Sequence, residues 1–234
     1  RAGLAGAVVF SFTDDWFKDG RHVDDWAMGL TRKDRGLKPS FKVVQQGFRR
    51  APYFKLLRYP KVSVVVACYN GARTLKACLD SLQNLHYPDF ETTLDDDGST
   101  NATADIASHY DQVRLLSQRN YGLGVARNTG IAAARGEIVA FTDADCRADE
   151  DWLFYLTSDL LDSNFAGLGG PNVLPPEDSP VAAAVMASPG GPAHVMLTDE
   201  VAEHIPGCNM AFYKWALDEI AGFDPIYRKA GDDV

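Results

Sequence analysis

The sequence predicts an α/β protein with a mostly parallel sheet and helices on both of its faces, preceded by a partial β/α unit. Two observations lead to this prediction. After residue 60, short apolar runs typical of buried strands alternate with segments whose apolar residues recur at helical spacing. Before that point, residues 5–12 form one apolar run of the strand type and residues 39–50 a helix-like segment, which together make the expected partial unit.

Length and composition are those of an ordinary globular protein. The 234 residues are 46% hydrophobic and 24% charged, which is enough for one large core or two modest ones. The net charge of −9 and the lack of a long basic run argue against nucleic acid as a partner. The same charge implies that a phosphate ligand would need a metal ion or nearby Arg and Lys side chains.

The spacing of the cysteines and the hydropathy of the sequence indicate where in the cell the protein is located. The four cysteines are far apart in the sequence and include no Cys-x-x-Cys pair, so we expect reduced thiols rather than disulfides or a zinc site. No apolar run approaches the ~18 residues of a transmembrane helix, and no signal peptide pattern is present. We therefore expect a location in the cytoplasm or at the inner face of a membrane, with membrane association only through parts of the protein outside this chain.

The first segment has its own pattern. An apolar run at 5–12 ends in the acids Asp14 and Asp15, and a helical segment follows. On these features, residues 1–50 resemble the closing strand and helix of a (β/α)8 barrel of the glycoside hydrolase type. Acids at the end of a barrel strand can be catalytic, but one strand of eight cannot build a glycosidase site. We expect a separate fragment, joined to the rest by a linker at 51–60 that contains two prolines.

The elements expected after residue 60 alternate in type. A fully apolar strand is followed by a helix with one apolar stripe, and the order then repeats. The expected elements are a strand at 62–67, a helix with Leu75, Cys78, Leu79 and Leu82 in its stripe, a strand at 90–94, a helix at 104–110 and a strand at 113–116. This alternation favours a parallel, doubly wound sheet.

The following helix is rich in small residues. Leu123, Ala126, Gly130 and Ala134 share one face, so we expect this helix to lie close to the sheet, with Gly136 as its C-cap. The remaining expected elements are a strand at 137–145, a helix at 150–161, an irregular or partly helical segment at 175–206 and a helix at 215–220.

Two carboxylates, Asp143 and Asp145, end the apolar run that begins at Glu137. The carboxyl ends of strands are the usual place for ligand binding in open α/β sheets. Side chains two residues apart in an extended segment point the same way, so both carboxylates can converge on one divalent cation. The alternative is a solvated acidic turn, and the triplet alone does not decide between the two.

Five segments match one family pattern in order: VSVVVACYN, DDGST, NYGLGVARNTGIAAARGEIVAFTDAD, GCNMAF and GFDP…AGDDV. Together they resemble a family 2 glycosyltransferase with the Rossmann-like GT-A fold over residues 61–234. The resemblance implies transfer of a sugar from a nucleotide-diphosphate donor to an acceptor hydroxyl, with inversion and with Mg²⁺ or Mn²⁺. The expected donor is a UDP-sugar, and the expected acceptor is a sugar or glycolipid.

The resemblance also implies roles on the donor side. Ala67 and Tyr69 would border the nucleoside, with the ring of Tyr69 beside the base. Asp96 and Asp97 would accept hydrogen bonds from the base or the ribose. Asp95 stands where the family usually has an apolar residue, which leaves open which of the three carboxylates faces the nucleotide. The alternatives are a tyrosine packed on the first helix and an acidic turn that caps the next one.

For the metal and the phosphates, the resemblance places Asp143 near the ribose and the ion. Asp145 would ligate the ion that bridges the two phosphates of the donor. Arg127 would stabilise a phosphate, and its alternative role is that of an ordinary surface arginine.

On the acceptor side, the resemblance implies that Gly207 and Asn209 line the site, with Cys208 as a small buried filler. Asp233 would be the general base that takes the proton from the acceptor hydroxyl, and Asp232 stands where many relatives carry Glu. The further helix and the Gln-x-x-Arg-Trp-type element of processive members are missing. We therefore expect a domain truncated at its C-terminus, and the activity of this chain stays open.

Two other functions are compatible with parts of the pattern. A dehydrogenase-like Rossmann enzyme has the same alternation of strands and helices, but it would carry Gly-x-Gly-x-x-Gly after the first strand, where this chain has the turn 68–71. A non-catalytic carbohydrate-associated module is the second alternative. It predicts that nucleotides do not bind in a metal-dependent way.

Overall fold

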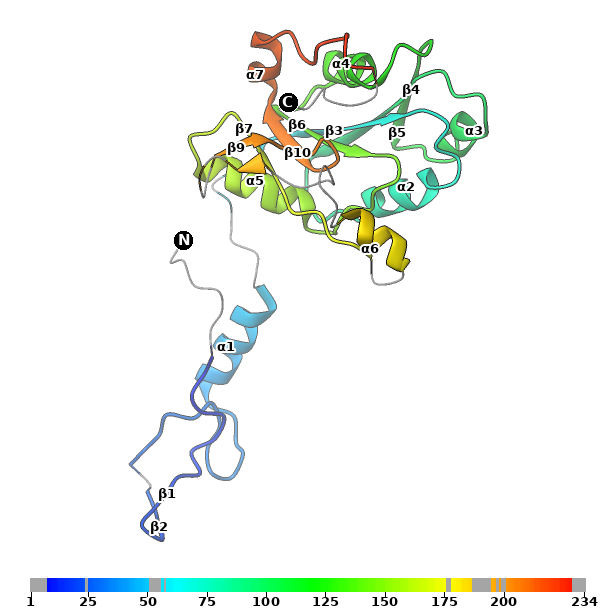
Figure 1. Ribbon diagram of the computed structural model, residues 1–234. Coiled ribbons are helices and arrows are strands. Elements are labelled where there is room, and N and C mark those ends of the chain that lie inside the picture. Colours follow the sequence, from blue (N-terminus) through cyan, green and yellow to red (C-terminus); the bar gives the residue numbers. More distant parts are fainter. Residues whose placement is uncertain are drawn as a thin grey trace. The chain divides into compact units, whose positions relative to one another are not determined.

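The computed structural model describes residues 8–23, 25–50, 56, 58–175, 178–186, 195–196, 198 and 201–228. Contacts within the chain divide it into two compact units, residues 1–57 and residues 58–234 (Figure 1). Both units are described below, each by itself.

The first unit is small and only partly ordered into regular elements. It contains the two-stranded hairpin of β1 (Phe17–Lys18) and β2 (Arg21–His22), followed by helix α1 (Pro39–Arg50) at the predicted position. The strand predicted at 5–12 is wrong over its described residues 8–12. Their backbone contacts another segment at only a few points, so no continuous ladder forms. The apolar side chains of this run remain exposed, by 97% for Val8 and 70% for Phe10.

The second unit is built on a six-stranded sheet, and the predicted mostly parallel α/β fold is confirmed. The strand order is β5-β4-β3-β6-β10-β7 (Figure 1). The four strands from β5 to β6 are parallel, while β10 runs antiparallel to both of its neighbours. The strands are β3 (Val62–Cys68), β4 (Phe90–Asp96), β5 (Val113–Ser117), β6 (Ile138–Asp143), β7 (Gly167–Gly169) and β10 (Met210–Tyr213).

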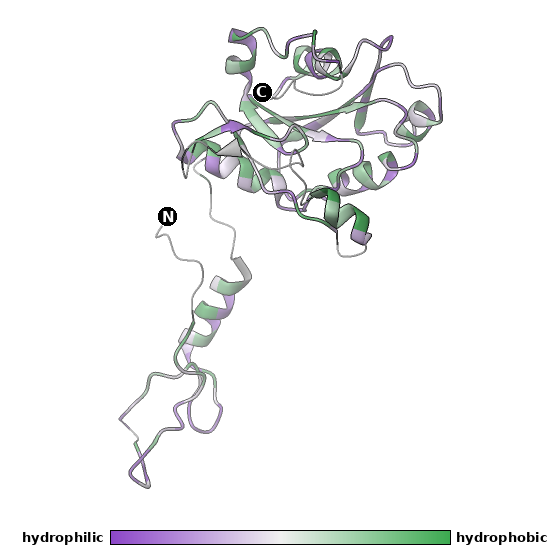
Figure 2. Cartoon of the chain, viewed as in Figure 1, coloured by the Kyte–Doolittle hydropathy of each residue, from purple (hydrophilic) through white to green (hydrophobic). Residues whose placement is uncertain are grey.

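Helices cover both faces of this sheet. One face packs against α2 (Leu75–Gln83), α3 (Thr103–Ala107) and α5 (Trp152–Asp162), and the other against α4 (Leu123–Ala133) and α7 (Lys214–Glu219). The strands between the two helical layers are largely coloured as hydrophobic in Figure 2, as expected for a sheet buried on both faces. The predicted stripe of α2 is confirmed, since all four of its residues are buried.

Helix α4 lies very close to the sheet because of Gly130. A Cβ at this position would come 3.0 Å from Val65 Cγ2, which is too close for a side chain. The predicted C-cap at Gly136 is wrong, because the helix ends at Ala133 with Ala134 in the cap position. Gly136 instead allows close backbone packing: a Cβ there would come 2.6 Å from the Ser63 nitrogen.

The segment between β7 and β10 is partly helical, as predicted. It contains α6 (Pro180–Met186), β8 (Val195–Met196) and β9 (Ala202–His204). Helix α6 is coloured hydrophobic over most of its length in Figure 2, although none of its side chains is buried. Among the helices of the described residues, none combines the length and the apolar character that a membrane span requires.

Candidate functional site

Three parallel strands end side by side at the site. In the register of the sheet, Ala67 of β3 lies opposite Asp95 of β4 on one side and Asp143 of β6 on the other. Asp97 follows β4, and its backbone N–H donates to the carbonyl of Cys68 at 2.9 Å. These strand ends therefore meet at one edge of the sheet, and the edge is the one where open α/β sheets bind ligands.

A cavity of about 1120 Å³, here called the first cavity, opens at the ends of β3 and β4. Three of the residues predicted to bind the donor line it, namely Ala67, Tyr69 and Asp97. Tyr69 is 56% exposed, so its ring is accessible to a ligand rather than packed into the core. The other lining residues are Cys68, Asn120, Gly122, Leu123, Ala126, Ile226, Tyr227 and Arg228.

Residues 226–228 form part of this cavity, and sequence reasoning does not single them out. The Leu123 N–H donates to the carbonyl of Arg228 at 3.0 Å, and the Arg228 guanidinium donates to the carbonyl of Asn120 at 3.2 Å. These bonds hold the segment against the start of α4. The preceding GFDP motif belongs to the family pattern, but nothing in the sequence indicates that the chain returns to this helix.

Asp97 supports the loop before α4 as well as the first cavity. Its carboxylate accepts hydrogen bonds from Gln118 Nε2 at 2.8 Å, from the Tyr121 N–H at 2.9 Å and from the Gly122 N–H at 2.8 Å. The residue is only 3% exposed. A fixed carboxylate with several internal donors is well suited to hold the wall of a ligand cavity in one conformation.

The other two acids of the run lie within β4, so the predicted end of this strand at residue 94 is wrong. Asp96 accepts a hydrogen bond from the Ser99 N–H at 3.0 Å. Asp95 is fully buried, and neither of its carboxyl oxygens has a hydrogen-bond partner among the described residues. Burial raises the pKa of Asp95 to about 7, and the charges of Asp97 and Asp96 add to this shift. Asp95 is thus an interior carboxyl rather than one that faces a ligand.

The two candidate metal ligands come from β6 and its following turn. Asp143 is the last residue of β6 and its side chain is 36% exposed, while Asp145 in the turn is exposed. The carbonyl of Asp143 accepts hydrogen bonds from the Cys146 N–H at 3.0 Å and from the Cys78 thiol at 3.5 Å, which fixes the turn. Two accessible carboxylates on one fixed turn are a suitable donor set for a hard divalent cation.

A second cavity, of about 920 Å³, lies beside this turn. Asp145 and Cys146 of the turn, Trp152 of α5, and Cys208 and Asn209 before β10 contribute to its wall. Its apolar side is formed largely by α6 and the segment before it, through Val173, Leu174, Val181, Ala182, Val185 and Met186. The predicted acceptor-side residue Asn209 thus lies in the same cavity wall as the predicted metal ligand Asp145.

Arg127 is not a surface arginine. It is 3% exposed, and its Nη2 lies 3.4 Å from Asp143 Oδ1. The guanidinium carbon also lies 5.4 Å from the centre of the Phe223 ring, within the range of a cation–π contact. Gly207 packs directly on the guanidinium, so the predicted acceptor-side turn touches the arginine that contacts the first metal candidate.

Asn209 acts as a brace between walls of the second cavity. Its Oδ1 accepts a hydrogen bond from Trp152 Nε1 at 2.8 Å, and its Nδ2 donates to the carbonyl of Pro171 at 2.9 Å. Asn209 lines the second cavity, and its place on the acceptor side stays a prediction. Both ends of the amide bind protein groups, so its effect on a ligand would come through the walls that it joins.

The four cysteines form two groups that their sequence spacing does not indicate. Burial raises the pKa of Cys68 to about 11 and that of Cys78 to about 12. Cys146 and Cys208 are half-buried and line the same cavity. The neighbouring Cys208 and burial raise the pKa of Cys146, while the neighbouring Cys146 lowers the pKa of Cys208. The expectation of Cys208 as a buried filler is therefore wrong, because it lines the second cavity.

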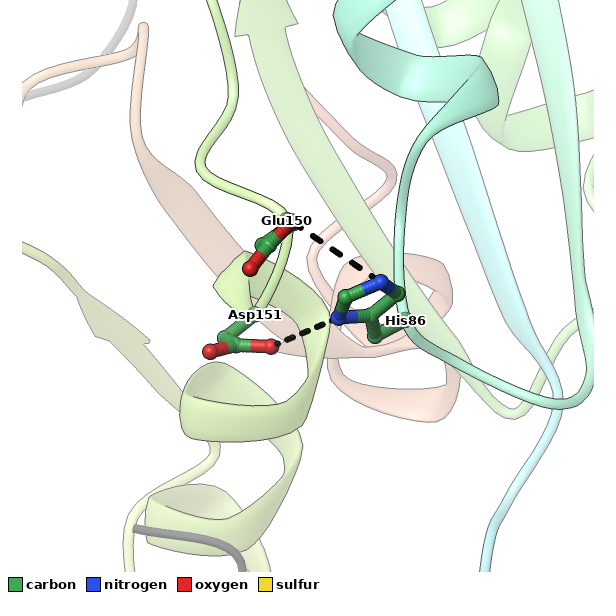
Figure 3. A group of neighbouring side chains, drawn as sticks. All are labelled: His86, Glu150 and Asp151. Atoms are coloured by element: carbon green, nitrogen blue, oxygen red, sulfur yellow. Dashed lines mark hydrogen bonds and ion pairs between the residues drawn. The ribbon is translucent and has the colours of Figure 1, made fainter. Parts of the chain in front are cut away.

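One further cluster of metal-ligating side chains is found among the described residues, made of His86, Glu150 and Asp151 (Figure 3). His86 Nδ1 lies 3.3 Å from Asp151 Oδ1, and His86 Nε2 lies 3.8 Å from Glu150 Oε2. The two carboxylates thus engage opposite nitrogens of one ring. One ring nitrogen and one oxygen of each carboxylate lie within 4.8 Å of one another, and the three residues are not among those that line the two cavities.

Two predicted site residues, Asp232 and Asp233, lie outside the described residues. The other predicted residues fall around the two cavities and the turn between them. Ala67, Tyr69 and Asp97 line the first cavity, and Asp145 and Asn209 line the second. Arg127 lies between Asp143 and Gly207, and Asp96 is the last residue of β4.

Comparison with known proteins agrees with this geometry. The family model described as Glycosyl transferase family 2 matches residues 63–219. The chain is 42% identical over 98 residues to the putative glycosyltransferase EpsH of Bacillus subtilis, covering 40% of this chain and 27% of that protein. It is 37% identical over 101 residues to the glycosyltransferase AglE of Haloferax volcanii, covering 40% of this chain and 33% of that protein. The chain therefore matches a third or less of the length of these relatives.

Solved structures share the fold at lower identity. The mannosyltransferase PcManGT from Pyrobaculum calidifontis, in complex with GDP-Man and Mn²⁺, aligns with a TM-score of 0.58 at 23% identity over 83% of this chain and 56% of that chain. S. aureus TarS 1-349 in complex with UDP aligns with a TM-score of 0.56 at 20% identity over 74% of this chain and 52% of that chain. Since the family model spans well over half of the sequence, the chain belongs to glycosyl transferase family 2.

Proposed function

We propose that this chain is the donor-binding part of a glycosyltransferase that moves a sugar from a nucleotide-diphosphate donor to an acceptor hydroxyl, with inversion and with Mg²⁺ or Mn²⁺. The observation that carries the proposal is the meeting of three strand ends at one edge of the sheet, with a cavity on either side of the Asp143 turn. Family membership supports the same reaction class.

The nucleoside of the donor would occupy the first cavity. The exposed ring of Tyr69 offers an aromatic face for the base, and Asp97 and Ala67 form the adjoining wall. Asp96 is the second acid at this strand end that could accept a hydrogen bond from the base or ribose. A UDP-sugar is the proposed donor, and the UDP complex of the similarly folded TarS supports it.

Asp145 and Asp143 would hold the divalent cation. The fit rests on the chemistry of the donor set: two accessible carboxylates supply the oxygen ligands that Mg²⁺ and Mn²⁺ prefer. When bound, the ion supplies positive charge that offsets the charge developing on the leaving diphosphate. Buried Arg127, 3.4 Å from Asp143, orients that carboxylate and adds a fixed positive charge at the phosphate side of the site.

The acceptor would enter through the second cavity. The turn at 206–209 and the brace from Asn209 to Trp152 shape this cavity beside Asp145. An inverting transfer needs a base that removes the proton from the attacking hydroxyl on the side opposite the leaving group. Asp233 is the proposed base, and a sugar or glycolipid the proposed acceptor.

The test is a calorimetric titration of UDP, GDP and dTDP, each with and without Mn²⁺. We expect one of the nucleotides to bind, with affinity at least tenfold higher in the presence of Mn²⁺. Binding that is equally strong without the metal would contradict the role of the Asp143 turn. A complete lack of nucleotide binding would favour the non-catalytic carbohydrate-associated module instead.

A further inference from the structure

Cys146 and Cys208 are brought together by the reversal of one strand. Strand β10 runs antiparallel to β6 with Met210 opposite Phe141, so the residues just before β10 lie beside those just after β6. Cys208 is in the first group and Cys146 in the second. Cys208 precedes Met210 by two residues, and the Cys146 N–H donates to the carbonyl of Asp143, two residues after Phe141, at 3.0 Å. The two cysteines are far apart in the sequence and yet line the same cavity.

Both thiols are accessible from the second cavity. Each lines its wall and is half-buried, so a small reagent that enters the cavity can reach them. Cys68 and Cys78 differ in this respect, since they are only 4% and 1% exposed. Accessibility and proximity are the two conditions for disulfide exchange, and the described cysteines meet both conditions only at this pair.

We propose that Cys146 and Cys208 form a disulfide site, which a low-molecular-weight disulfide such as oxidised glutathione closes. The thiolate of one cysteine attacks a sulfur of the small disulfide, giving a mixed disulfide and one released thiol. The thiolate of the second cysteine then displaces the other small thiol and forms the protein disulfide. Two cysteine thiols are oxidised and one small disulfide is reduced to two thiols, which take up the two protons.

The bond would join the two turns that build the reaction site. Cys146 follows the candidate ligand Asp145, and Cys208 lies between Gly207 and Asn209. A covalent link here restricts how the metal turn and the acceptor-side turn move relative to each other. We therefore expect the oxidised form to bind nucleotide more weakly in the presence of Mn²⁺. This expectation rests on the proposed function.

Peptide mapping after oxidation tests the site without any donor or metal. The protein is incubated with oxidised glutathione, remaining thiols are blocked, and tryptic peptides are analysed by mass spectrometry. Trypsin separates the four cysteines, because Cys146 lies in 136–147, Cys208 in 148–214, Cys68 in 62–73 and Cys78 in 77–114. We expect a linked 136–147 and 148–214 pair with the mass of two hydrogens lost.

Variants in which one cysteine is replaced by serine test whether Cys146 and Cys208 pair with each other. Cys146→Ser and Cys208→Ser each leave one accessible thiol, which can form only a mixed disulfide with glutathione. Each variant should therefore gain one glutathionyl group where the parent loses two hydrogens, and Cys68→Ser should behave like the parent. Glutathionylation of both cysteines in the parent without the linked pair, or linkage of Cys68 to Cys78 instead, would overturn the proposal.

A second measurement tests the effect of the disulfide on nucleotide binding. Mn²⁺-dependent UDP binding is titrated for the reduced protein, the oxidised protein, and the oxidised protein after treatment with a thiol reductant. We expect a loss of about tenfold in affinity on oxidation and full recovery on reduction. An oxidised protein with the mapped disulfide and unchanged affinity would overturn the effect on the site. If the reduced protein binds no nucleotide, the proposed function fails while the mapped disulfide remains a separate result.

Discussion

Gly207 lies against the guanidinium of Arg127, and a Cβ at Gly207 would come 2.8 Å from Arg127 Cζ. The same guanidinium contacts Asp143 Oδ1 at 3.4 Å. The turn before β10, helix α4 and the end of β6 therefore meet at one buried arginine. Gly207 and the carboxylate of Asp143 thus both contact one side chain.

The first prediction concerns this contact. Gly207→Ala should displace the Arg127 guanidinium from Asp143, because the new methyl group needs the space that the guanidinium occupies. Loss of a hydrogen bond to a charged group costs about 1.5 to 3 kcal/mol, so Mn²⁺-dependent nucleotide binding should weaken roughly ten- to a hundredfold in calorimetric titration. Gly47→Ala in α1 is the matched control, since a Cβ there meets nothing within 4 Å. Unchanged binding by the Gly207 variant would show that the arginine does not position the metal turn.

The second prediction separates the two carboxylates of the turn. Asp145→Asn should nearly abolish Mn²⁺-dependent nucleotide binding while the fold remains intact, because the amide keeps the shape and loses the charge. Asp143→Asn should weaken binding less, since the ribose contact is only part of the donor affinity. Circular dichroism checks the fold, and Asp111→Asn at an exposed position is the matched control. Parental affinity in the Asp145 variant would rule out its role as a ligand.

A third prediction follows from the proposed base. Asp233→Asn should leave nucleotide binding almost unchanged, because the base acts on the acceptor alone, while turnover is lost in any form of the protein that is active. The comparison uses titration of the nucleotide and a sugar-transfer assay on the same preparations. If the variant retains its turnover, another group must take the proton from the acceptor hydroxyl.

The fourth prediction is a pH dependence of stability that arises from Asp95. Its pKa is raised from 3.8 to about 7, mainly by burial, and the nearby Thr129 hydroxyl offsets this only in part. Between about pH 4 and pH 7 the unfolded chain loses this proton while the folded chain keeps it. The contribution of Asp95 to the free energy of unfolding is therefore greatest at low pH. It falls as the pH rises toward 7, with a slope of at most ~1.4 kcal/mol per pH unit.

Urea unfolding at a series of pH values measures this slope. Asp95→Val should remove the contribution and raise the free energy of unfolding above pH 7, because an apolar side chain suits a fully buried strand position without hydrogen-bond partners. Asp111→Asn again provides the control. A Val variant that follows the parent's pH profile would mean that Asp95 titrates normally in the folded protein.

A fifth prediction concerns the first unit. Removal of residues 1–57 should leave the thermal unfolding midpoint of the remaining unit nearly unchanged, because both core clusters consist entirely of residues in 58–234. Differential scanning calorimetry of the full and shortened chains makes the comparison. A drop of many degrees would mean that the first unit contributes to the stability of the second.

Much of the parallel part of the sheet is predictable because local patterns decide it. Val62 to Cys68 is apolar except for Ser63 and is buried along its whole length, and the α2 stripe has the spacing of a helix packed on one side. The strand at 5–12 has an equally apolar pattern, yet its described residues do not join a sheet. An apolar pattern indicates that a segment is suited to pairing, but a strand forms only where a partner is present.

Part of the candidate site is also predictable from local sequence patterns. The acids at the ends of β4 and β6 indicate the edge of the sheet at which the site lies, because the two strands are parallel and end at the same edge. Burial of Arg127, the brace at Asn209 and the contact between Cys146 and Cys208 depend on the insertion of β10 between β6 and β7. That pairing joins segments far apart in the chain, and the short β7 strand Gly-Leu-Gly carries little local signal.

The reversal of β10 has a consequence for how such proteins diversify. Because β10 returns the chain to this edge by pairing with β6, that pairing places the turn before β10 beside the Asp143 turn, and the connection between β7 and β10 adds hydrogen bonds to the turn before β10 at Gly170 and Pro171. That path includes α6, which forms part of the wall of the second cavity. Evolution can exchange the rest of this connection, in length and in chemistry, while the strand pairing stays the same. Under the proposed function, such an exchange would change the acceptor and leave the donor site as it is.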